Sequence, residues 1–171
     1  ASESTISGNI DGNGKLVLSV YYTRDSYKII ANNNNEKAGE STKVNGNYRY
    51  DKQITLTATT NAGYTFLGWF DGETLACATA NFIFNVDKNV TYTAKWSANT
   101  DTKYTVNYYL QNLDDNNYTL HETQELKGET NTTATAEIKE YSHFTYNEGE
   151  STISGNIDGN GKLVLSVYYT R

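Results

Sequence analysis

The chain has 171 residues, a formal net charge of −6 and a sequence pI near 4.9. Tyr, Thr and Asn are abundant, with 15 Tyr and 13 Gly, whereas Pro and Met are absent. The acidic balance and the lack of a Lys/Arg cluster argue against a nucleic-acid partner and against direct membrane contact, because both require a basic footprint. The single Cys77 excludes an intrachain disulfide and a zinc site built on cysteines.

An exact internal repeat is the strongest signal in the sequence. Residues 3–24 and 150–171 carry the same 22 letters, ESTISGNIDGNGKLVLSVYYTR, 147 positions apart. We expect the chain to be one link of a tandem array, in which residues 25–171 form a period and residues 1–24 close the preceding copy. Arrays of near-identical units usually build length or multivalency rather than a single active site.

The repeated segment predicts a β-hairpin at both of its positions. Residues 153–157 and 162–170 have the composition of strands, and the Asp-Gly-Asn-Gly sequence at 158–161 is a hairpin turn signal. Alternation along the second strand gathers one apolar face, made of Leu163, Leu165, Val167 and Tyr169. Residues 1–24 are therefore expected to be the C-terminal hairpin of the preceding copy, with open edges and an apolar face that needs cover.

Residues 25–98 are expected to form a first β-rich module. Strand patterns occur at residues 27–31, 53–59, 64–70, 80–86 and 90–96. Strict alternation in the third stretch places Leu67 and Trp69 on one face together with Thr65. In the last stretch one face collects Val90, Tyr92, Ala94 and Trp96. Residues 32–47, which include four consecutive Asn, are expected to be a loop or an irregular edge strand.

Residues 103–171 are expected to form a second β-rich module after a short polar joint at 99–102. Strands are predicted at 104–110 and 118–126, separated by an Asp/Asn turn. In the first of these strands, Tyr104, Val106, Tyr108 and Leu110 are expected to face inward. Residues 134–141 are ambiguous, because Ala134, Ile138 and Tyr141 fit one helical face whereas residues 132–136 could extend a strand. We predict a short helix there.

The two segments can be laid over each other, which predicts two divergent copies of one module. Each opens with an aromatic-led strand, continues through a Thr/Ala run and an aromatic Thr cluster, and closes on a hairpin that ends in aromatic residues. The predicted fold class is mainly β, or α+β at most. The predicted domains are residues 1–24, 25–98 and 103–171, with the two modules in an elongated arrangement.

Both modules resemble known bacterial repeats. The stretch GYTFLGWF at 63–70, with ITLTAT at 54–59 and VTYTAKW at 90–96, resembles the divergent internalin B-type repeat, also called the Listeria–Bacteroides repeat, over residues 25–97. Residues 103–171 resemble the mucin-binding-protein type of repeat. The matching features are YTVNYY at 104–109, LKGET at 126–130, the aromatic residues Tyr141 and Phe144, and the closing strand.

The resemblance implies small β-grasp-like modules on surface proteins of bacteria, mostly Gram-positive ones. It implies an extracellular adhesin at the cell surface or cell wall, whose anchoring sequence lies outside these residues. We expect a stalk or spacer that also binds a host glycan or surface protein weakly and multivalently. The alternative is a dedicated glycan- or protein-binding module in which the stalk role is secondary. Neighbouring repeat copies of the same chain are the other expected partners.

No residue pattern predicts catalysis, a cofactor or a metal site, so an enzyme is not expected. Neither family carries a catalytic motif, and His121, His143 and Cys77 fit no nucleophile or metal-ligand pattern. The acidic turns at 11–14, 114–117 and 158–161 lack the ligand spacing of a calcium loop. A Lys–Asn isopeptide crosslink of the kind found in surface adhesins stays open, since the required residue types are plentiful.

The doubled tyrosines supply the candidate binding residues. A Tyr-Tyr pair in a strand puts one ring on each face of the sheet. The outward rings, Tyr21, Tyr109 and Tyr168, are either cross-strand packing partners or part of a sugar- or protein-binding surface. Of these two hypotheses we favour cross-strand packing.

Overall fold

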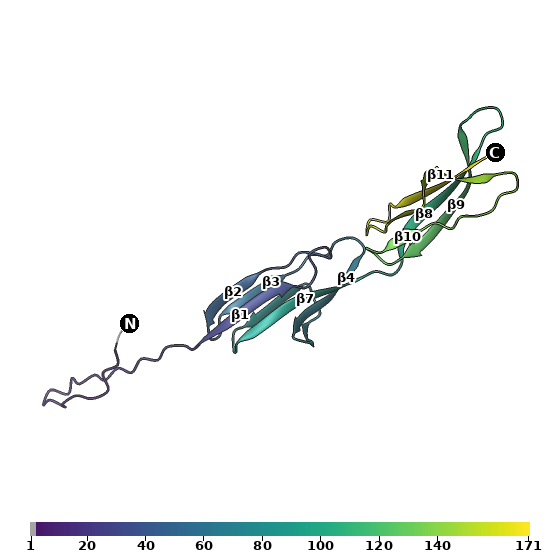
Figure 1. The fold of residues 1–171 in the computed structure, drawn as a ribbon. Helices are drawn as coiled ribbons and strands as arrows, with labels where there is room; N and C mark the ends of the chain where they lie inside the picture. The colour runs from purple at the N-terminus through teal and green to yellow at the C-terminus, as the bar shows by residue number, and fades with distance from the viewer. Residues whose placement is uncertain (1–2) are drawn as a thin grey trace.

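The fold is built entirely from β-strands over the part of the chain that is described. The structure, a computed structural model, describes residues 3–171. These residues form thirteen strands and no helix (Figure 1). The mainly β class is therefore confirmed, as expected where Tyr and Thr fill the strands and Asn and Gly fill the turns. Residues 3–171 contain no helix that is long and apolar enough to cross a membrane.

The first module, residues 25–98, holds a five-stranded mixed sheet in the order β2-β1-β7-β4-β5. The strands are β1 (Ser26–Asn33), β2 (Val44–Arg49), β4 (Tyr64–Asp71), β5 (Thr74–Cys77) and β7 (Val90–Ala98). The first and last strands of the module, β1 and β7, are parallel neighbours, and the other pairs are antiparallel. A separate antiparallel pair packs against the same core and consists of β3 (Gln53–Thr57) and β6 (Asn81–Asn85).

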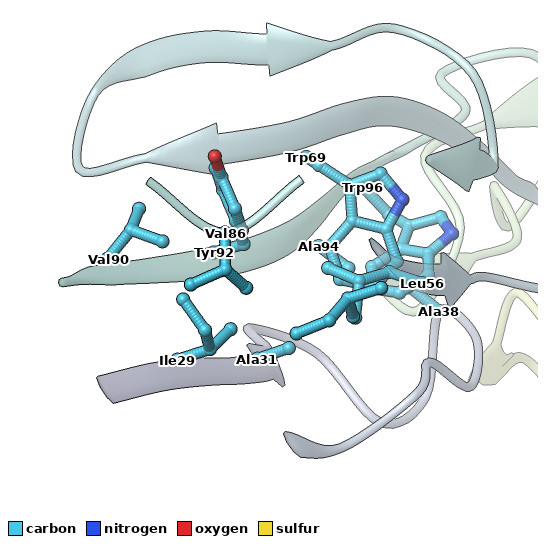
Figure 2. Close-up of a cluster of buried hydrophobic side chains, with 11 residues drawn as sticks. Ile29, Ala31, Ala38, Leu56, Trp69, Val86, Val90, Tyr92, Ala94 and Trp96 are labelled. Atoms are coloured by element: carbon cyan, nitrogen blue, oxygen red, sulfur yellow. The ribbon is translucent and has the colours of Figure 1, made fainter. Parts of the chain in front are cut away.

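Alternation along β7 sets the core of the first module. The four residues predicted to share one face of this strand, Val90, Tyr92, Ala94 and Trp96, are all buried. Trp69 of β4 and Leu56 of β3 are fully buried in the same cluster (Figure 2). The sheet and the β3–β6 pair therefore share one apolar interior that contains both tryptophans of the chain.

A β-bulge in β4 overturns the predicted faces of that strand. The register to β7 shifts between Phe66 and Gly68, so one extra residue is inserted. Gly68 has a φ of +130°, and a β-carbon there would collide with the neighbouring strand. The insertion puts Phe66 and Trp69 in edge-to-face contact, with ring centroids 6.4 Å apart, and leaves Leu67 45% exposed. The prediction that Leu67 and Trp69 share a face is wrong for this reason.

The second module, residues 103–171, repeats the plan of the first. Its four-stranded sheet has the order β11-β13-β8-β9, with β8 and β13 parallel, and a short β10–β12 pair stands beside it. The strands are β8 (Thr102–Gln111), β9 (Tyr118–Gly128), β10 (Thr133–Thr135), β11 (Thr145–Thr152), β12 (Ser154–Asn156) and β13 (Val164–Thr170). In topology they take the places of β1, β2, β3, β4, β6 and β7. The sequence overlay pairs the segments of four of these strands in the same way, namely β8, β10, β11 and β13 with β1, β3, β4 and β7.

The core of the second module follows the predicted inward faces of its central strands. Val106 and Tyr108 of β8 and Leu165, Val167 and Tyr169 of β13 are buried. Ile157, Ala134 and Ala136 add to this cluster from the short pair and the loops beside it. The cluster is separate from the core of the first module, so each module has an interior of its own.

Two predictions for the second module are wrong. Residues 134–141 form no helix, because β10 covers the start of this stretch and only Ala134 and Ala136, two positions apart, are buried. The closing hairpin is also absent. β12 pairs with β10, whereas β13 pairs with β8 and β11, so the turn at 158–161 joins two different sheets. In both places strands from elsewhere in the chain decide the outcome over the local pattern. The first module likewise lacks a closing hairpin, because β6 pairs with β3 and not with β7. The hairpin predicted for residues 3–24 is reduced to one isolated strand bridge, Thr5–Ser19.

The sequence pattern does not predict β2, β5 or β11. All three are edge strands. Asn, Gly, Glu or Thr occupies much of β2 and β11, and β5 is only four residues long. β2 begins inside the stretch expected to be a loop or an irregular edge strand. The β-grasp likeness of the modules stays a prediction.

The two modules lie end to end, with residues 3–24 beyond the first module and Arg171 at the opposite end (Figure 1). Because β1 and β7 are parallel, the chain enters the first module at one pole and leaves at the other. The same holds for β8 and β13 in the second module. Only residues 99–101 separate β7 from β8. The parallel pairing of first and last strands therefore explains the predicted elongated arrangement.

Candidate functional site

Three tyrosine rings form a cluster on the outer face of the second sheet. Tyr109 of β8 and Tyr168 of β13 are cross-strand neighbours, and their rings stack with centroids 4.7 Å apart and 13° between their planes. Tyr118, the first residue of β9, meets Tyr168 edge-on with centroids 5.0 Å apart. The Asn147 side-chain amide donates to the Tyr118 hydroxyl at 3.0 Å. We refer to Tyr109, Tyr118 and Tyr168 as the tyrosine cluster.

The tyrosine cluster contains two of the three candidate binding residues. Tyr109 and Tyr168 make the cross-strand contact that we favoured from the sequence. Tyr21, the copy of Tyr168, is 55% exposed in residues 3–24 and is not part of the cluster. Sequence reasoning missed Tyr118, because only the register of β9 brings it beside the other two rings. A binding role for these residues stays a prediction.

A charged network around Glu122 lies on the core side of the second sheet. Lys139 Nζ donates to Glu122 Oε1 at 2.6 Å, and the Tyr141 hydroxyl donates to Glu122 Oε2 at 3.0 Å. Lys139 Nζ also lies 4.5 Å from the centroid of the Tyr108 ring, a cation–π geometry. Glu122 and Tyr108 are register partners in β9 and β8. The network therefore ties the edge strand β9 to the irregular segment that follows β10.

The hydrogen bonds of this network determine which of its side chains are charged. Hydrogen bonds from Lys139 and then from Tyr141 hold the pKa of Glu122 below its usual range, and the same bond raises the pKa of Lys139. Burial raises the pKa of Tyr141, and its bond to Glu122 adds to this. Glu122 is therefore ionised and Tyr141 neutral near neutral pH. The Gln124 side-chain amide also donates to Glu122 Oε1 at 3.0 Å, and a carboxylate that already accepts from three donors serves as a structural acceptor.

The other residues considered from the sequence make ordinary structural contacts. The His121 ring packs edge-on against Tyr141 with centroids 5.2 Å apart, and His143 lies in a turn with a φ of +66°. The Cys77 sulfur is 3.3 Å from the Thr79 hydroxyl. At the acidic turns the carboxylates accept from their own loops, as Asp115 does from the Asn117 amide at 2.8 Å. Across residues 3–171 no three His, Cys, Asp or Glu side chains are grouped to hold a metal ion.

A close-packed junction joins the two modules. Gly63, with a φ of +81°, and Gly159 touch backbone to backbone, so a β-carbon on either would overlap the opposite module. Asn99 connects the same region, because its N–H donates to the Gly63 carbonyl at 2.8 Å and its carbonyl accepts from the Thr130 N–H at 2.9 Å. Sequence reasoning missed the junction, since Gly159 is equally well explained as a turn residue.

Taken together, the fold and these sites define a class of protein: an all-β repeat protein made of small modules joined in series. Residues 29–100 match the family model of the divergent InlB B-repeat domain. The resemblance predicted for residues 25–97 is thus confirmed. The family suggests a surface repeat domain, and together with the all-β fold it points to a non-catalytic module. No curated protein matches the chain.

Proposed function

We propose that the chain is a stalk unit of a bacterial surface adhesin, which projects a distal part of the protein away from the cell. The observation that carries this proposal is the parallel pairing of first and last strands in each module. In such a module the chain enters at one end and leaves at the opposite end. Every module added in series therefore makes the array longer. The exact 22-residue repeat supports the same role, because identical units suit a rod.

Short joints favour a rod with little freedom to fold back. Three residues, 99–101, separate β7 from β8, and the Gly63–Gly159 contact packs this joint. At the other joint of the repeat, only Arg24 and Asp25 lie between the copy of β13 and β1. Arg24 donates to the Tyr50 carbonyl at 3.1 Å and thereby contacts the first module. Both joints are too short to act as flexible linkers between modules.

The stalk proposal predicts the length added by each period. The 22 residues from Val90 to Gln111 span β7, the joint and β8 along the long axis, which at roughly 3.3 Å per residue corresponds to about 70 Å. Small-angle scattering on chains of one, two and three periods tests this. The maximum dimension is expected to rise by about 70 Å for each period. A particle whose dimension hardly grows with copy number would refute the stalk.

The surface location is part of the same proposal and rests on the family of residues 29–100. Antibodies raised against residues 25–171 should label intact bacterial cells that carry the parent protein. Labelling that requires permeabilised cells would contradict a surface location, whatever the shape of the repeat.

Weak multivalent binding to a host glycan or surface protein is the second candidate function, and the tyrosine cluster favours it. Its half-buried rings give a partly exposed aromatic patch of the kind that packs on sugar rings or apolar protein surfaces. A chain of three periods should bind glycan or matrix-protein arrays more strongly than one period. Tyr109→Ala should abolish that signal, whereas Tyr21→Ala should leave it unchanged. Silence from the three-period chain would remove this candidate.

A further inference from the structure

Both copies of the repeated segment end on an arginine, and each copy shows one side of the joint between periods. Arg171 contacts the module that the segment closes, and Arg24 contacts the module that follows the segment. The two residues hold the same place in the repeat, 147 positions apart. A tandem array places a module on both sides of this arginine, so the contacts of Arg171 and Arg24 can be combined.

Arg171 is held at the C-terminal end of the second module. Its N–H donates to Gln111 Oε1 at 3.1 Å, and its Nε–H donates to the Gln111 carbonyl at 3.3 Å. The guanidinium also lies over the Phe144 ring, with Cζ 4.8 Å from the ring centroid. Gln111 is the last residue of β8 and Phe144 directly precedes β11, so the arginine caps this end of the sheet.

Arg24 is held where the first module begins. Its Nη1 donates to the Tyr50 carbonyl at 3.1 Å and lies 4.0 Å from the Asp51 carboxylate. The chain is fixed directly after it, because the Tyr50 N–H donates to the Asp25 carbonyl at 2.8 Å. Both side chains of the Arg24–Asp51 ion pair are more than half exposed, so this pair adds little, and the bond to the carbonyl sets the geometry.

We propose that the arginine at this position clamps each period to the next, by bonding a different nitrogen to each module. Nε donates to the carbonyl of Gln111 in the preceding module, and Nη1 donates to the carbonyl of Tyr50 in the following one. These nitrogens lie on different edges of the planar guanidinium, so neither bond takes a donor that the other needs. The partner is the next repeat of the same chain, which makes the clamp dependent on the tandem array behind the proposed function.

The joint inside the period already uses one residue to hold two modules. The Asn99 N–H donates to the Gly63 carbonyl of the first module, and the Asn99 carbonyl accepts from the Thr130 N–H of the second. At the joint between periods the strand ladder of one module ends at the counterpart of Thr170, and Asp25 is already bonded to the next module. The arginine is therefore the single residue between them, and its side chain takes the part that the Asn99 backbone takes at the other joint.

The clamp needs the guanidinium group and not only its charge. A lysine at this position keeps the positive charge but ends in one nitrogen on a flexible stem. It lacks two donors fixed on different edges of a plane, so it can hold one carbonyl while it leaves the other module free. Arg24→Lys therefore separates the clamp from a general attraction to Asp51.

The experiment uses the chain with residues 103–149 placed before residues 3–171. This addition restores the module that residues 3–24 close, so Arg24 has a complete module on each side. Spin labels are attached to Glu125→Cys in the added module and to Thr91→Cys in the first module, both exposed strand positions, with Cys77→Ser in every chain. The distribution of distances between the two labels should be narrow. Arg24→Lys should make it about twice as wide, because modules without a fixed contact move relative to each other.

Arg171→Lys in the same chain is the matched control. It makes the same change in the same 22-residue segment, but no module follows it in this chain, so the distance distribution should stay narrow. Fluorescence of Trp69 and Trp96, which both lie in the first module, should match the parent in every variant. A broad distribution in the parent, a narrow one in Arg24→Lys, or equal broadening by Arg171→Lys would show that the proposal is wrong.

The label distances decide the clamp, and the maximum dimension from small-angle scattering decides the stalk. If the dimension grows with the added module while Arg24→Lys leaves the distances narrow, the clamp is wrong and the stalk stands. If the dimension hardly grows, the stalk is wrong, whatever the label distances.

Discussion

The two copies of the 22-residue segment carry one sequence in two environments. In residues 150–171 the segment contributes a central strand to a sheet, and the Leu165, Val167 and Tyr169 side chains are almost completely buried. In residues 3–24 it keeps its turn and one strand bridge, yet its apolar side chains are exposed. Local sequence is sufficient for the turn. The strand becomes part of a sheet only where β8, β10 and β11 are there to receive it.

This difference explains which substitutions should matter. A side chain stabilises the protein by the contacts it makes, so the same substitution should have unequal effects at positions 147 apart. Each position in residues 3–24 is thus an internal control for its copy, with identical chain neighbours and none of the burial. The predictions below use this control wherever the copy supplies one.

Leu165→Ala should give the largest effect. Removing this fully buried side chain leaves a cavity between the central strands, which should lower the unfolding free energy of the second module by about 2–5 kcal/mol. Leu18→Ala should change it by less than about 0.5 kcal/mol. Urea unfolding followed by the amide signals of β8 measures both. Equal losses from the two variants would mean that residues 3–24 are buried after all.

Tyr169→Phe should give the next largest effect. The buried Tyr169 hydroxyl accepts a hydrogen bond from the Lys139 backbone amide at 2.8 Å, and its loss leaves that amide without the partner. The expected cost is about 1–3 kcal/mol in the second module. Tyr22→Phe is the matched control and should be neutral. A neutral Tyr169→Phe variant would indicate that water replaces the hydroxyl at that site.

Gly159→Ala should change shape more than stability. A β-carbon there overlaps the Ala62 carbonyl of the first module, whereas one at Gly12 meets nothing within 4 Å. The junction should open while the unfolding free energy of each core stays within about 0.5 kcal/mol. Residual dipolar couplings of the two modules should then require two alignment tensors in place of one. Gly12→Ala should leave one shared tensor, and an unchanged tensor in Gly159→Ala would contradict the packed junction.

The smallest effect should come from pH and should be confined to the second module. The folded pKa of Glu122 is held below its unfolded value, which is about 4.3. Its contribution is therefore complete above that unfolded value and is lost as pH falls through the folded pKa. Urea midpoints of the second module should drop across this acid range, and Glu122→Gln should flatten the drop. A second module that responds like the first would argue against the network.

Strict alternation of apolar and polar residues is enough to predict a strand from the sequence. The predictions fail where a bulge or a pairing partner elsewhere in the chain decides the structure. β7, β8 and β13 lie within two residues of their predicted bounds and face as predicted, because their apolar side chains recur at every second position. The error at Leu67 comes from a bulge at Gly68, which no period-two pattern can express. The predicted closing hairpin is wrong because its first strand, β12, pairs with β10 and its second strand, β13, pairs with β8.

The candidate sites follow the same division. The outward facing of Tyr109 and Tyr168 is predictable from the doubled tyrosines of their strands. The position of Tyr118 in the tyrosine cluster depends on the register of β9. The Glu122 network depends on the segment between β10 and β11, which is neither strand nor helix and whose helix-like pattern misled the prediction. The junction at Gly63 and Gly159 joins residues far apart in the chain, so only the folded arrangement reveals it.

The parallel pairing of β1 with β7, and of β8 with β13, also determines how the molecule responds to tension. A pull on the two ends draws each pair of central strands in opposite directions along their length. All hydrogen bonds of the pair are then loaded together in shear, instead of breaking one after another as in a zipper. Under traction from a moving surface, each module should therefore resist extension far more strongly than its small size and modest core suggest.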